Sequence, residues 1–303
     1  MVSRFKAAKE KEGPQILFSR CLCDYHAMPP NASIFTSHYV VNDVSLFALR
    51  VHDNVSEKAV VYLSSIGDAG NNAEDNAKII WMHCLSISYS PMYVDQNCHG
   101  VTTDWPRIPL PDQRALLDNS VALGAQVAAL LDTEADVPGV TSGTVAEHLR
   151  VLGGISSTDL SVRAGWGSRD SKGRVNPGLG KTETRDWTGP EKEALRNGFA
   201  AQGIDEARGF ALLGRAIDVF LNETTFWACV PEAAWDYVIG GYLVIKKWLS
   251  YREEAILGRP IVKDEAREVT AMIRRLTTLI LLSDRLDENY EACRDNCYSW
   301  PTP

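Results

Sequence analysis

The chain has 303 residues, 45% of them hydrophobic, so it can bury a substantial core in one large domain or two ordinary ones. Its formal net charge of −8 weighs against a protein that simply coats nucleic acid, because phosphate binding requires a concentrated positive field. The charged N-terminus lacks the apolar run of a signal peptide, and no apolar stretch reaches the roughly 18 residues of a membrane span. We therefore expect a cytoplasmic protein that does not bind membranes.

The residues before about 100 are rich in β-branched and aromatic side chains, and Asn, Asp, Gly and Pro interrupt them. This composition predicts strands at 34–41, 44–51 and 59–66. The segment 72–89 predicts a helix, because Asn71 or Asn72 can cap it and acidic residues occupy its first turn.

The segment DWPRIPLPD, residues 104–112, has three prolines in six residues and must run extended. Asp112 is then expected to cap a helix over 113–132, whose apolar residues recur at helical spacing. The Gly-, Thr- and Ser-containing segment 133–144 is the best linker candidate.

We place a domain boundary at this linker. Residues 1–135 are then a strand-rich α+β part, and residues 136–303 form hairpins and a helical bundle. The predicted fold class is α+β.

The second part begins with a polar, glycine-rich and basic stretch, residues 163–187, which is typical of exposed strands or a long hairpin. Helices are predicted over 191–203, opened by Thr188, and over 205–218. A short hairpin is expected over 219–230, around Asn222 and Glu223.

Residues 235–252, WDYVIGGYLVIKKWLSYR, combine aromatic residues, a glycine pair and cations. We expect a brief helix from Pro231 that the glycines 240–241 end, and then a helix over 242–257 that Gly258 closes. Its apolar residues recur every three to four positions, which favours a core role; Lys246, Lys247 and Ser250 then fall on the other face. A last amphipathic helix is expected over 263–282.

The sequence contains no recognisable catalytic or metal-binding motif. GLGKT lacks the first glycine of a phosphate loop and does not follow an apolar strand, and no G-x-S-x-G sequence occurs. The seven cysteines have no repeating framework, which indicates reduced thiols. Cys21, Cys23 and His26, with Cys98 and His99, match no zinc-ligand spacing, so we predict no metal site.

The run VPEAAWDYVIGGYLVIKKWLSYREEAILGRPI, followed by KDEAREVTAMIRRL, resembles the C-terminal specificity region of type ISP restriction-modification enzymes and related adenine-specific DNA methyltransferases. Supporting matches are DWPRIPLP, AGWG, GLGK and DVFLNETTFW. The resemblance covers most of residues 100–290 and is weaker before residue 100, where it rests on LFSRCLCDYHAMPPNASIFTSHYVV. That stretch looks like the one that joins a methyltransferase core to the specificity domain, so the resemblance implies that residues 1–135 join to such a core and that residues 136–303 belong to the target recognition domain.

The resemblance implies sequence-specific recognition of duplex DNA for an adenine-N6 methyltransferase in a phage-defence system. Family enzymes carry N-P-P-Y and a glycine-rich loop for S-adenosylmethionine upstream, and these 303 residues contain neither. We therefore expect a target recognition domain, as a fragment or a separate subunit, that is not catalytic alone. S-adenosylmethionine is expected on a partner methyltransferase module. Two alternatives stay open: a protein-interaction or assembly subunit without DNA binding, which the net acidity favours, and a small enzyme with an unrecognised site.

Basic residues are the candidates for contact with DNA. Those in the glycine-rich stretch can donate to guanine edges in the major groove, and those near residue 250 can contact phosphates. Ordinary solvated side chains are the alternative. The predicted DNA-binding residues are Arg163, Arg169, Lys172, Arg174, Lys181, Arg185, Lys246, Lys247 and Arg252.

Overall fold

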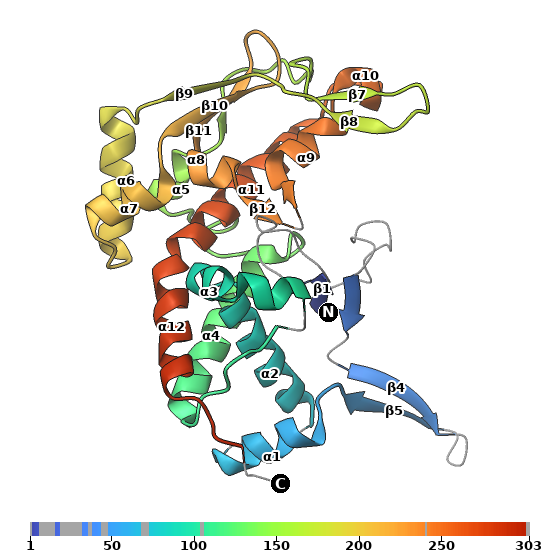
Figure 1. Ribbon diagram of the computed structural model, residues 1–303. Helices are drawn as coiled ribbons and strands as arrows, with labels where there is room; N and C mark the ends of the chain where they lie inside the picture. Colours follow the sequence, from blue (N-terminus) through green and yellow to red (C-terminus); the bar gives the residue numbers. More distant parts are fainter. Residues whose placement is uncertain are drawn as a thin grey trace. The chain divides into compact units, whose positions relative to one another are not determined.

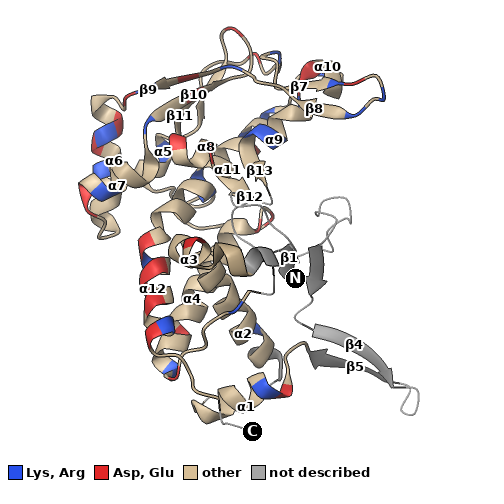
Figure 2. Cartoon of the chain, viewed as in Figure 1, with Lys and Arg blue, Asp and Glu red and all other residues tan. Residues whose placement is uncertain are grey.

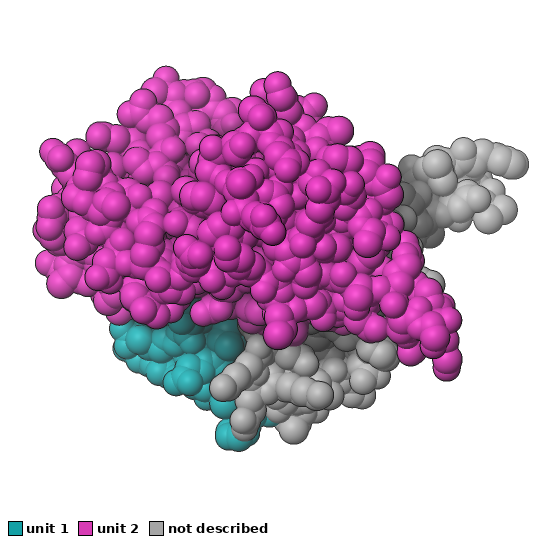
Figure 3. All heavy atoms as spheres, turned by 90° about the horizontal axis from the view of Figure 1, so that it is seen from above, with its two compact units in different colours: residues 1–132, 282–303 teal, residues 133–281 magenta. Residues whose placement is uncertain are grey.

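The computed structural model describes the backbone of residues 2–5, 16–18, 32–35, 38–43, 48–67, 73–103, 106–239 and 241–300 (Figure 1). Side chains are described for 54–67, 76–100, 106–239 and 241–300. The chain divides into two compact units: unit 1 contains residues 1–132 and 282–303, and unit 2 contains residues 133–281 (Figure 3). The linker pattern places a boundary between 135 and 136, whereas the division in the structure falls between 132 and 133.

Unit 1 begins with short antiparallel strands. A three-stranded sheet has the order β2-β1-β3, and a separate pair forms a hairpin. The strands are β1 (Val2–Phe5), β2 (Ile16–Phe18), β3 (Ala32–Phe35), β4 (His38–Asp43) and β5 (Ala48–Asp53). The single strand predicted over 34–41 covers the end of β3 and most of β4, which belong to different sheets, and β5 confirms the described part, 48–51, of the strand predicted over 44–51.

Five helices complete the described part of unit 1, the last of them coming from the C-terminal segment. They are α1 (Glu57–Ser65), α2 (Ala73–Ser88), α3 (Pro91–Thr103), α4 (Arg114–Leu131) and α12 (Ser283–Asp295). α12 packs against α2, α3 and α4, so residues distant in sequence share one core. Gly124 permits the close approach of α4 to α2, since a Cβ there would lie 1.8 Å from the carbonyl oxygen of Met82.

The predicted strand over 59–66 is wrong, because these residues lie in α1. Ser56 caps this helix by accepting a hydrogen bond from the backbone N–H of Ala59, and Glu57 occupies its first turn. Tyr62 and Leu63 are fully buried, which stabilises each by roughly 1.5–3 kcal/mol and outweighs the β-propensity of the local sequence.

The helix predicted over 113–132 is confirmed as α4, but the predicted cap is wrong. The residue at the N-cap is Gln113, and it makes no side-chain capping bond. The backbone N–H of Asp112 donates instead to the carbonyl of Asn296, 2.8 Å away, which ties the start of α4 to the C-terminal segment. The predicted helix over 72–89 is confirmed as α2, while its proposed caps, Asn71 and Asn72, lie outside the described residues.

Unit 2 is built around a four-stranded antiparallel sheet of order β6-β11-β10-β9, with a separate hairpin, β7–β8. Its strands are β6 (Gly154–Ile155), β7 (Gly167–Arg169), β8 (Val175–Pro177), β9 (Thr182–Arg185), β10 (Ala216–Phe220), β11 (Phe226–Pro231), β12 (Val238–Ile239) and β13 (Tyr242–Leu243). Its helices are α5 (Glu147–Arg150), α6 (Gly189–Ala201), α7 (Glu206–Leu213), α8 (Glu232–Trp235), α9 (Val244–Ser250), α10 (Glu254–Leu257) and α11 (Lys263–Leu281).

The long helix α11 supplies much of the core of unit 2. It packs against β11, α7, α8 and α9, and Val269 and Ile273 on its apolar face are fully buried. Trp227 of β11 is also fully buried and donates its indole N–H to the carbonyl of Ala266 at the start of the helix, 3.4 Å away. The helix predicted over 263–282 is thereby confirmed.

Local signals place the next elements correctly. Thr188 forms the capping box of α6 with Glu191, and the hairpin predicted over 219–230 is formed by β10 and β11. The helix predicted over 205–218 is too long. It ends at Leu213, because Gly214 adopts φ 70°, and the chain then enters the buried strand β10.

The predicted pair of helices around the glycines 240–241 is also wrong in part. The brief helix α8 ends at Trp235, and Val238–Ile239 pairs with Tyr242–Leu243 as a small hairpin. The predicted helix over 242–257 is divided into α9 and α10, and Gly258 ends α10 with φ 78° as expected. Ser250 was expected on the exposed face of this helix but is fully buried.

These antiparallel sheets, flanked by helices that follow them in sequence, confirm the α+β fold class. Within the described ranges, no helix is both long and apolar enough to cross a membrane.

Candidate nucleic-acid interface

The β7–β8 hairpin presents three of the predicted cations on a turn that its own hydrogen bonds hold. Asp170 accepts hydrogen bonds from the backbone N–H groups of Lys172 and Arg174, at 2.8 and 2.9 Å, and from Nε of Arg174, at 2.8 Å. The bonds from Arg174 lower the pKa of Asp170, which keeps it ionised. Gly173 adopts φ 77° and donates its N–H to the Asp170 carbonyl. The tip is thus ordered while Arg174 stays 72% exposed.

The base of this hairpin is fixed against the helices that follow the aromatic stretch. β7 and β8 pack against α9, and β7 also contacts α10. A Cβ on Gly167 would lie 2.1 Å from the carbonyl oxygen of Ser250, so this approach requires glycine. Arg169 donates to the carbonyls of Gly173 and Ile256, which link the tip of the hairpin to α10.

Two of the predicted cations near residue 250, Lys247 and Arg252, are held against aromatic rings. The ammonium of Lys247 lies 4.4 Å from the ring centroid of Tyr242 and 5.0 Å from that of Tyr251. The guanidinium of Arg252 lies 4.4 Å from the Trp248 ring. Lys246 and Lys247 are both half-buried, so their stems pack on the protein as charged side chains on helix surfaces commonly do.

Figure 2 shows Lys and Arg at the β7–β8 hairpin and on α9. Because the hairpin packs on α9, the structure brings the cations of two sequence segments onto neighbouring elements of unit 2. These are Arg169, Lys172, Arg174, Lys246, Lys247 and Arg252.

Two further predicted residues, Arg163 and Lys181, line one pocket of about 550 Å³. Arg163 forms a paired interaction with Glu254, at 2.6 and 3.2 Å, and its side chain remains 61% exposed. The ammonium of Lys181 lies 3.7 Å from Glu183 and 4.0 Å from the centroid of the Phe220 ring.

The rest of the pocket lining comes from residues that sequence reasoning did not propose as site residues: Asp159, Ala164, Asn222, Glu223 and Thr224. Asn222 shapes this lining, because it accepts from the N–H groups of Thr224 and Thr225 and donates to the carbonyls of Asp159 and Ser161. The lining therefore combines two cations with two carboxylates. Its members lie in polar turns far apart in sequence, and no local pattern indicates that they meet.

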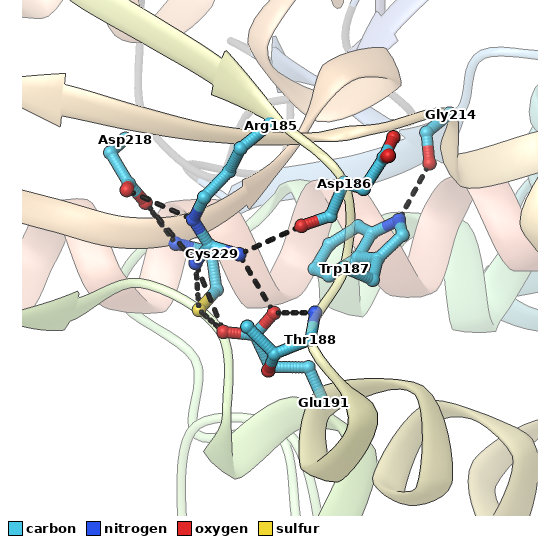
Figure 4. A network of polar contacts seen from close by, with 8 residues as sticks. All are labelled: Arg185, Asp186, Trp187, Thr188, Glu191, Gly214, Asp218 and Cys229. Atoms are coloured by element: carbon cyan, nitrogen blue, oxygen red, sulfur yellow. Dashed lines mark hydrogen bonds and ion pairs between the residues drawn. The ribbon is translucent and has the colours of Figure 1, made fainter.

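Arg185, the ninth predicted residue, is held in a polar network (Figure 4). Its guanidinium donates to both carboxylate oxygens of Glu191, at 2.9 and 3.0 Å, and to those of Asp218, at 3.0 and 3.4 Å. It also donates to the carbonyl of Asp186 and to Sγ of Cys229. The side chain is 30% exposed, and this geometry favours a structural role, joining β9 to β10 and α6.

A β-bulge builds this network. Asp218 of β10 faces two residues of β11, Ala228 and Cys229, and Cys229 adopts φ 58°. Asp218 accepts the N–H of Cys229 at 3.0 Å. Burial raises the pKa of the Cys229 thiol, and the adjacent Glu191 raises it further, to about 12, so the thiol remains a hydrogen-bond donor to Glu191.

No group of three or more His, Cys, Asp or Glu side chains is arranged as metal ligands in the part of the chain that the structure describes. Cys21, Cys23 and His26 lie outside that part.

A family model described as the Type ISP C-terminal specificity domain matches residues 3–279. Among solved structures, the ATP-dependent Type ISP restriction-modification enzyme LlaBIII bound to DNA is similar at 13% identity and a TM-score of 0.53, over 95% of this chain and 16% of that one. The DrdV–DNA complex is similar at 15% identity and a TM-score of 0.51, over 95% and 24%. No curated protein matches. The chain thus spans less than a quarter of either solved chain, and these two likenesses establish the fold.

Proposed function

The chain belongs to the Type ISP C-terminal specificity domain family, and from this premise we propose that it recognises a specific sequence in duplex DNA for an adenine-N6 methyltransferase or restriction-modification system. One observation supports this most strongly: the β7–β8 hairpin presents exposed cations on a turn that is already ordered. Two solved proteins of similar fold are described as DNA complexes, which is consistent with the proposal.

We assign different tasks to the parts of this surface. Arg169, Lys172 and Arg174 are suited to donate to guanine edges, because Arg and Lys donors match the O6 and N7 acceptors of the major groove. Lys246 and Lys247 are suited to phosphates, which position a duplex without distinguishing its sequence. An ordered turn binds with a smaller loss of conformational entropy than a flexible one.

The pocket lined by Arg163 and Lys181 suits a base edge better than a phosphate. Its two carboxylates, Asp159 and Glu223, would repel a phosphate, but they can accept hydrogen bonds from the exocyclic amine of cytosine or adenine. The two cations offer donors to guanine or to ring nitrogens. In this proposal the methyl donor, S-adenosylmethionine, binds a partner methyltransferase module, and this chain alone does not transfer methyl groups.

A binding selection tests the function. The full chain would be incubated at low salt with short duplexes whose central base pairs are randomised, and the retained DNA would be sequenced. We expect enrichment of one motif, and an affinity that falls steeply as the salt concentration rises, because each phosphate contact releases counterions.

Two triple variants then locate the interface. In R169A/K172A/R174A we expect affinity for the selected motif to fall by about tenfold or more, and affinity for random DNA to fall much less. The charge-matched control is K192A/R196A/R208A, on α6 and α7, which lie far from the hairpin within unit 2 (Figure 1). Absence of any enriched motif, together with equal binding by both variants, would contradict DNA recognition and favour the interaction-subunit alternative.

A further inference from the structure

Leu179 is the most exposed large apolar side chain in the described part of the chain, at 90%. It lies between Gly178 and Gly180 in the loop that joins β8 to β9. Folding gives no reason for leucine here, because a side chain that stays in water contributes almost nothing to the core. Single exposed apolar residues are common on proteins, so exposure alone decides nothing; the construction of the loop is the informative feature.

Both glycines that flank Leu179 are pinned to the segment 165–166. The N–H of Gly178 donates to the carbonyl of Trp166 at 2.6 Å, and the N–H of Gly180 donates to the carbonyl of Gly165 at 3.1 Å. A Cβ on Gly178 would lie 2.0 Å from the carbonyl oxygen of Gly165, and one on Gly180 would lie 2.0 Å from the Trp166 ring. These contacts fix the position of the loop on both sides of Leu179.

The segment beneath the loop is itself braced. Trp166 is fully buried, stacks edge-on with Trp235 at 5.4 Å, and donates its indole N–H to the carbonyl of Phe220 at 2.7 Å. The buried carboxylate of Glu253 accepts the backbone N–H groups of Gly165 and Trp166, at 3.2 and 2.8 Å. Leucine at 179 is thus presented on a rigid support.

The basic residues that neighbour the Leu179 loop in sequence indicate which kind of partner it binds. The loop continues directly into Lys181, and the segment beneath it follows Arg163 and Ala164; all three residues line the 550 Å³ pocket. The hairpin that ends just before the loop carries Arg169, Lys172 and Arg174. A rigid apolar tip that a basic hairpin precedes and Lys181 follows is complementary to DNA, whose phosphates are anionic and whose base stack is apolar.

We propose that Leu179 is a wedge that inserts between adjacent base pairs of the bound duplex and partly unstacks them. The proposal rests on the DNA-recognition function proposed above and adds to it a means of detecting deformability. Steps of a pyrimidine followed by a purine unstack most easily, so the wedge favours sites that place such a step opposite it, without a hydrogen bond to either base.

The test uses the duplex recovered by the selection above, with the fluorescent adenine analogue aminopurine placed in turn at each central step. We expect the unmodified chain to raise fluorescence at one step only, which marks unstacking there. Leu179→Ala should abolish this rise and weaken binding by at least about tenfold, the loss expected when a buried leucine side chain is truncated. Leu179→Phe should keep the rise, because a larger apolar side chain also acts as a wedge.

Two controls separate insertion from damage to the fold. The melting temperature of Leu179→Ala should equal that of the unmodified chain, because the side chain is exposed. Val262→Ala removes another exposed apolar side chain of unit 2, 51% exposed, and should leave both fluorescence and affinity unchanged.

The outcomes distinguish the wedge from the function on which it rests. The wedge is contradicted, and DNA recognition stands, if the duplex is bound tightly but aminopurine fluorescence rises at no step. The same conclusion follows if Leu179→Ala raises the fluorescence as much as the unmodified chain does. Weaker binding by Leu179→Ala without any unstacking also overturns insertion. If no duplex is enriched in the selection, both proposals fall.

Discussion

Arg185 has polar and charged neighbours in sequence, Thr184 and Asp186, so sequence alone predicts an exposed cation. The structure places its guanidinium against Glu191, Asp218 and Cys229 instead. Its partners lie up to 44 residues away in sequence, and one of them, Cys229, lies in a β-bulge of β11. For single residues, composition therefore predicted the charge correctly but could not predict the contacts.

Glu191 yields a prediction about acid stability. Burial would raise its pKa, but the hydrogen bonds from Arg185, Cys229 and the Thr188 N–H outweigh burial and lower the pKa to about 2. A carboxyl whose pKa falls on folding stabilises the protein above its unfolded value near 4.5, and this stabilisation is lost as the pH falls toward 2. We expect Glu191→Gln to destabilise by about 2 kcal/mol at neutral pH, and by progressively less below pH ~4.5.

Urea unfolding between about pH 3 and pH 7 measures this difference. Glutamine can retain the capping role of Glu191, so the change isolates the charge. The control is Glu193→Gln on the same helix, where the side chain is exposed and a change within about 0.5 kcal/mol is expected. Equal effects of the two substitutions at all pH values would contradict the network's role.

His83 yields a second prediction. Its Nε2–H donates to the carbonyl of Pro109 at 2.9 Å, so Nδ1 must accept the hydroxyl of Ser120 at 2.7 Å. Burial lowers the pKa of His83 to about 4, against a smaller upward effect of the Pro109 hydrogen bond. A histidine buried in neutral form stabilises the fold fully above pH ~6.5, and that contribution is lost as the pH falls toward 4.

Nuclear magnetic resonance can follow the imidazole carbon-bound protons during titration. The resonance that is missing in His83→Gln should stay unshifted from about pH 8 to pH 5.5 and move only below pH ~5. A midpoint near the ordinary histidine value of about 6.5 would show that the side chain is hydrated and that this buried network is not formed.

Helix ends and faces that carry a local sequence signal were predicted well, although the start of α10 was not. α6 has a capping box, α10 ends at a left-handed glycine, and α11 has a clear apolar face, so each is determined by local chemistry. α1 was not predicted, because its β-branched residues favour a strand until Tyr62 and Leu63 find partners in unit 1. Burial against residues distant in sequence therefore determines that this segment is a helix.

The loop that carries Leu179 provides an element-scale test of packing. Gly180→Ala would place a methyl group 2.0 Å from the Trp166 ring at φ 68°, so we expect it to destabilise the protein by about 1–3 kcal/mol. Gly189→Ala, at the first turn of α6, meets no atom within 4 Å and should be neutral or slightly stabilising. Urea unfolding of both variants measures this difference. Equal stability of the two variants would contradict the close contact between Gly180 and the Trp166 ring.

α9 provides the corresponding test of binding. Neutralising Lys246 and Lys247 together should weaken binding to the selected motif and to random DNA by the same factor, because phosphates carry no sequence information. The plot of log affinity against log salt should become shallower by up to about one unit for each lysine that no longer neutralises a phosphate. Binding measured across a salt series checks this, with Lys192→Ala on α6 as control. A change confined to the selected motif would instead assign these lysines to bases.

At the scale of the whole molecule, the linker pattern predicted a boundary between residues 135 and 136, close to the division that the structure has between 132 and 133, but not the return of the chain to unit 1. The sequence of α12 does not indicate which helices it packs against. Its buried residues, Tyr290 and Cys293, meet Ile87 and Tyr93 from nearly 200 positions earlier. Similarly, the basic composition of residues 163–187 could be seen in advance, whereas the pocket that joins Arg163 to Lys181 required the folded sheet.

Removal of residues 282–303 therefore tests the organisation of unit 1. Without α12, helices α2 and α4 keep their contact with each other but lose a shared packing partner, and we expect their amide protons to exchange at least about tenfold faster. Amides of β10 and β11, whose strand partners all belong to unit 2, should keep their protection. Hydrogen exchange followed by mass spectrometry measures both sets, with a chain lacking only residues 301–303 as control. Uniform loss of protection would contradict two separate cores.

Unit 2 is one uninterrupted stretch of sequence, residues 133–281, between the two segments that form unit 1. The part of the gene that encodes it can therefore be exchanged as a single piece. Two recombination crossovers, one on each side, replace every residue of the hairpin, the pocket and α11 at once. The same exchange leaves α12 and the helices it packs against untouched. A protein arranged in this way can acquire a new recognition surface in a single genetic event while keeping the core of its other unit.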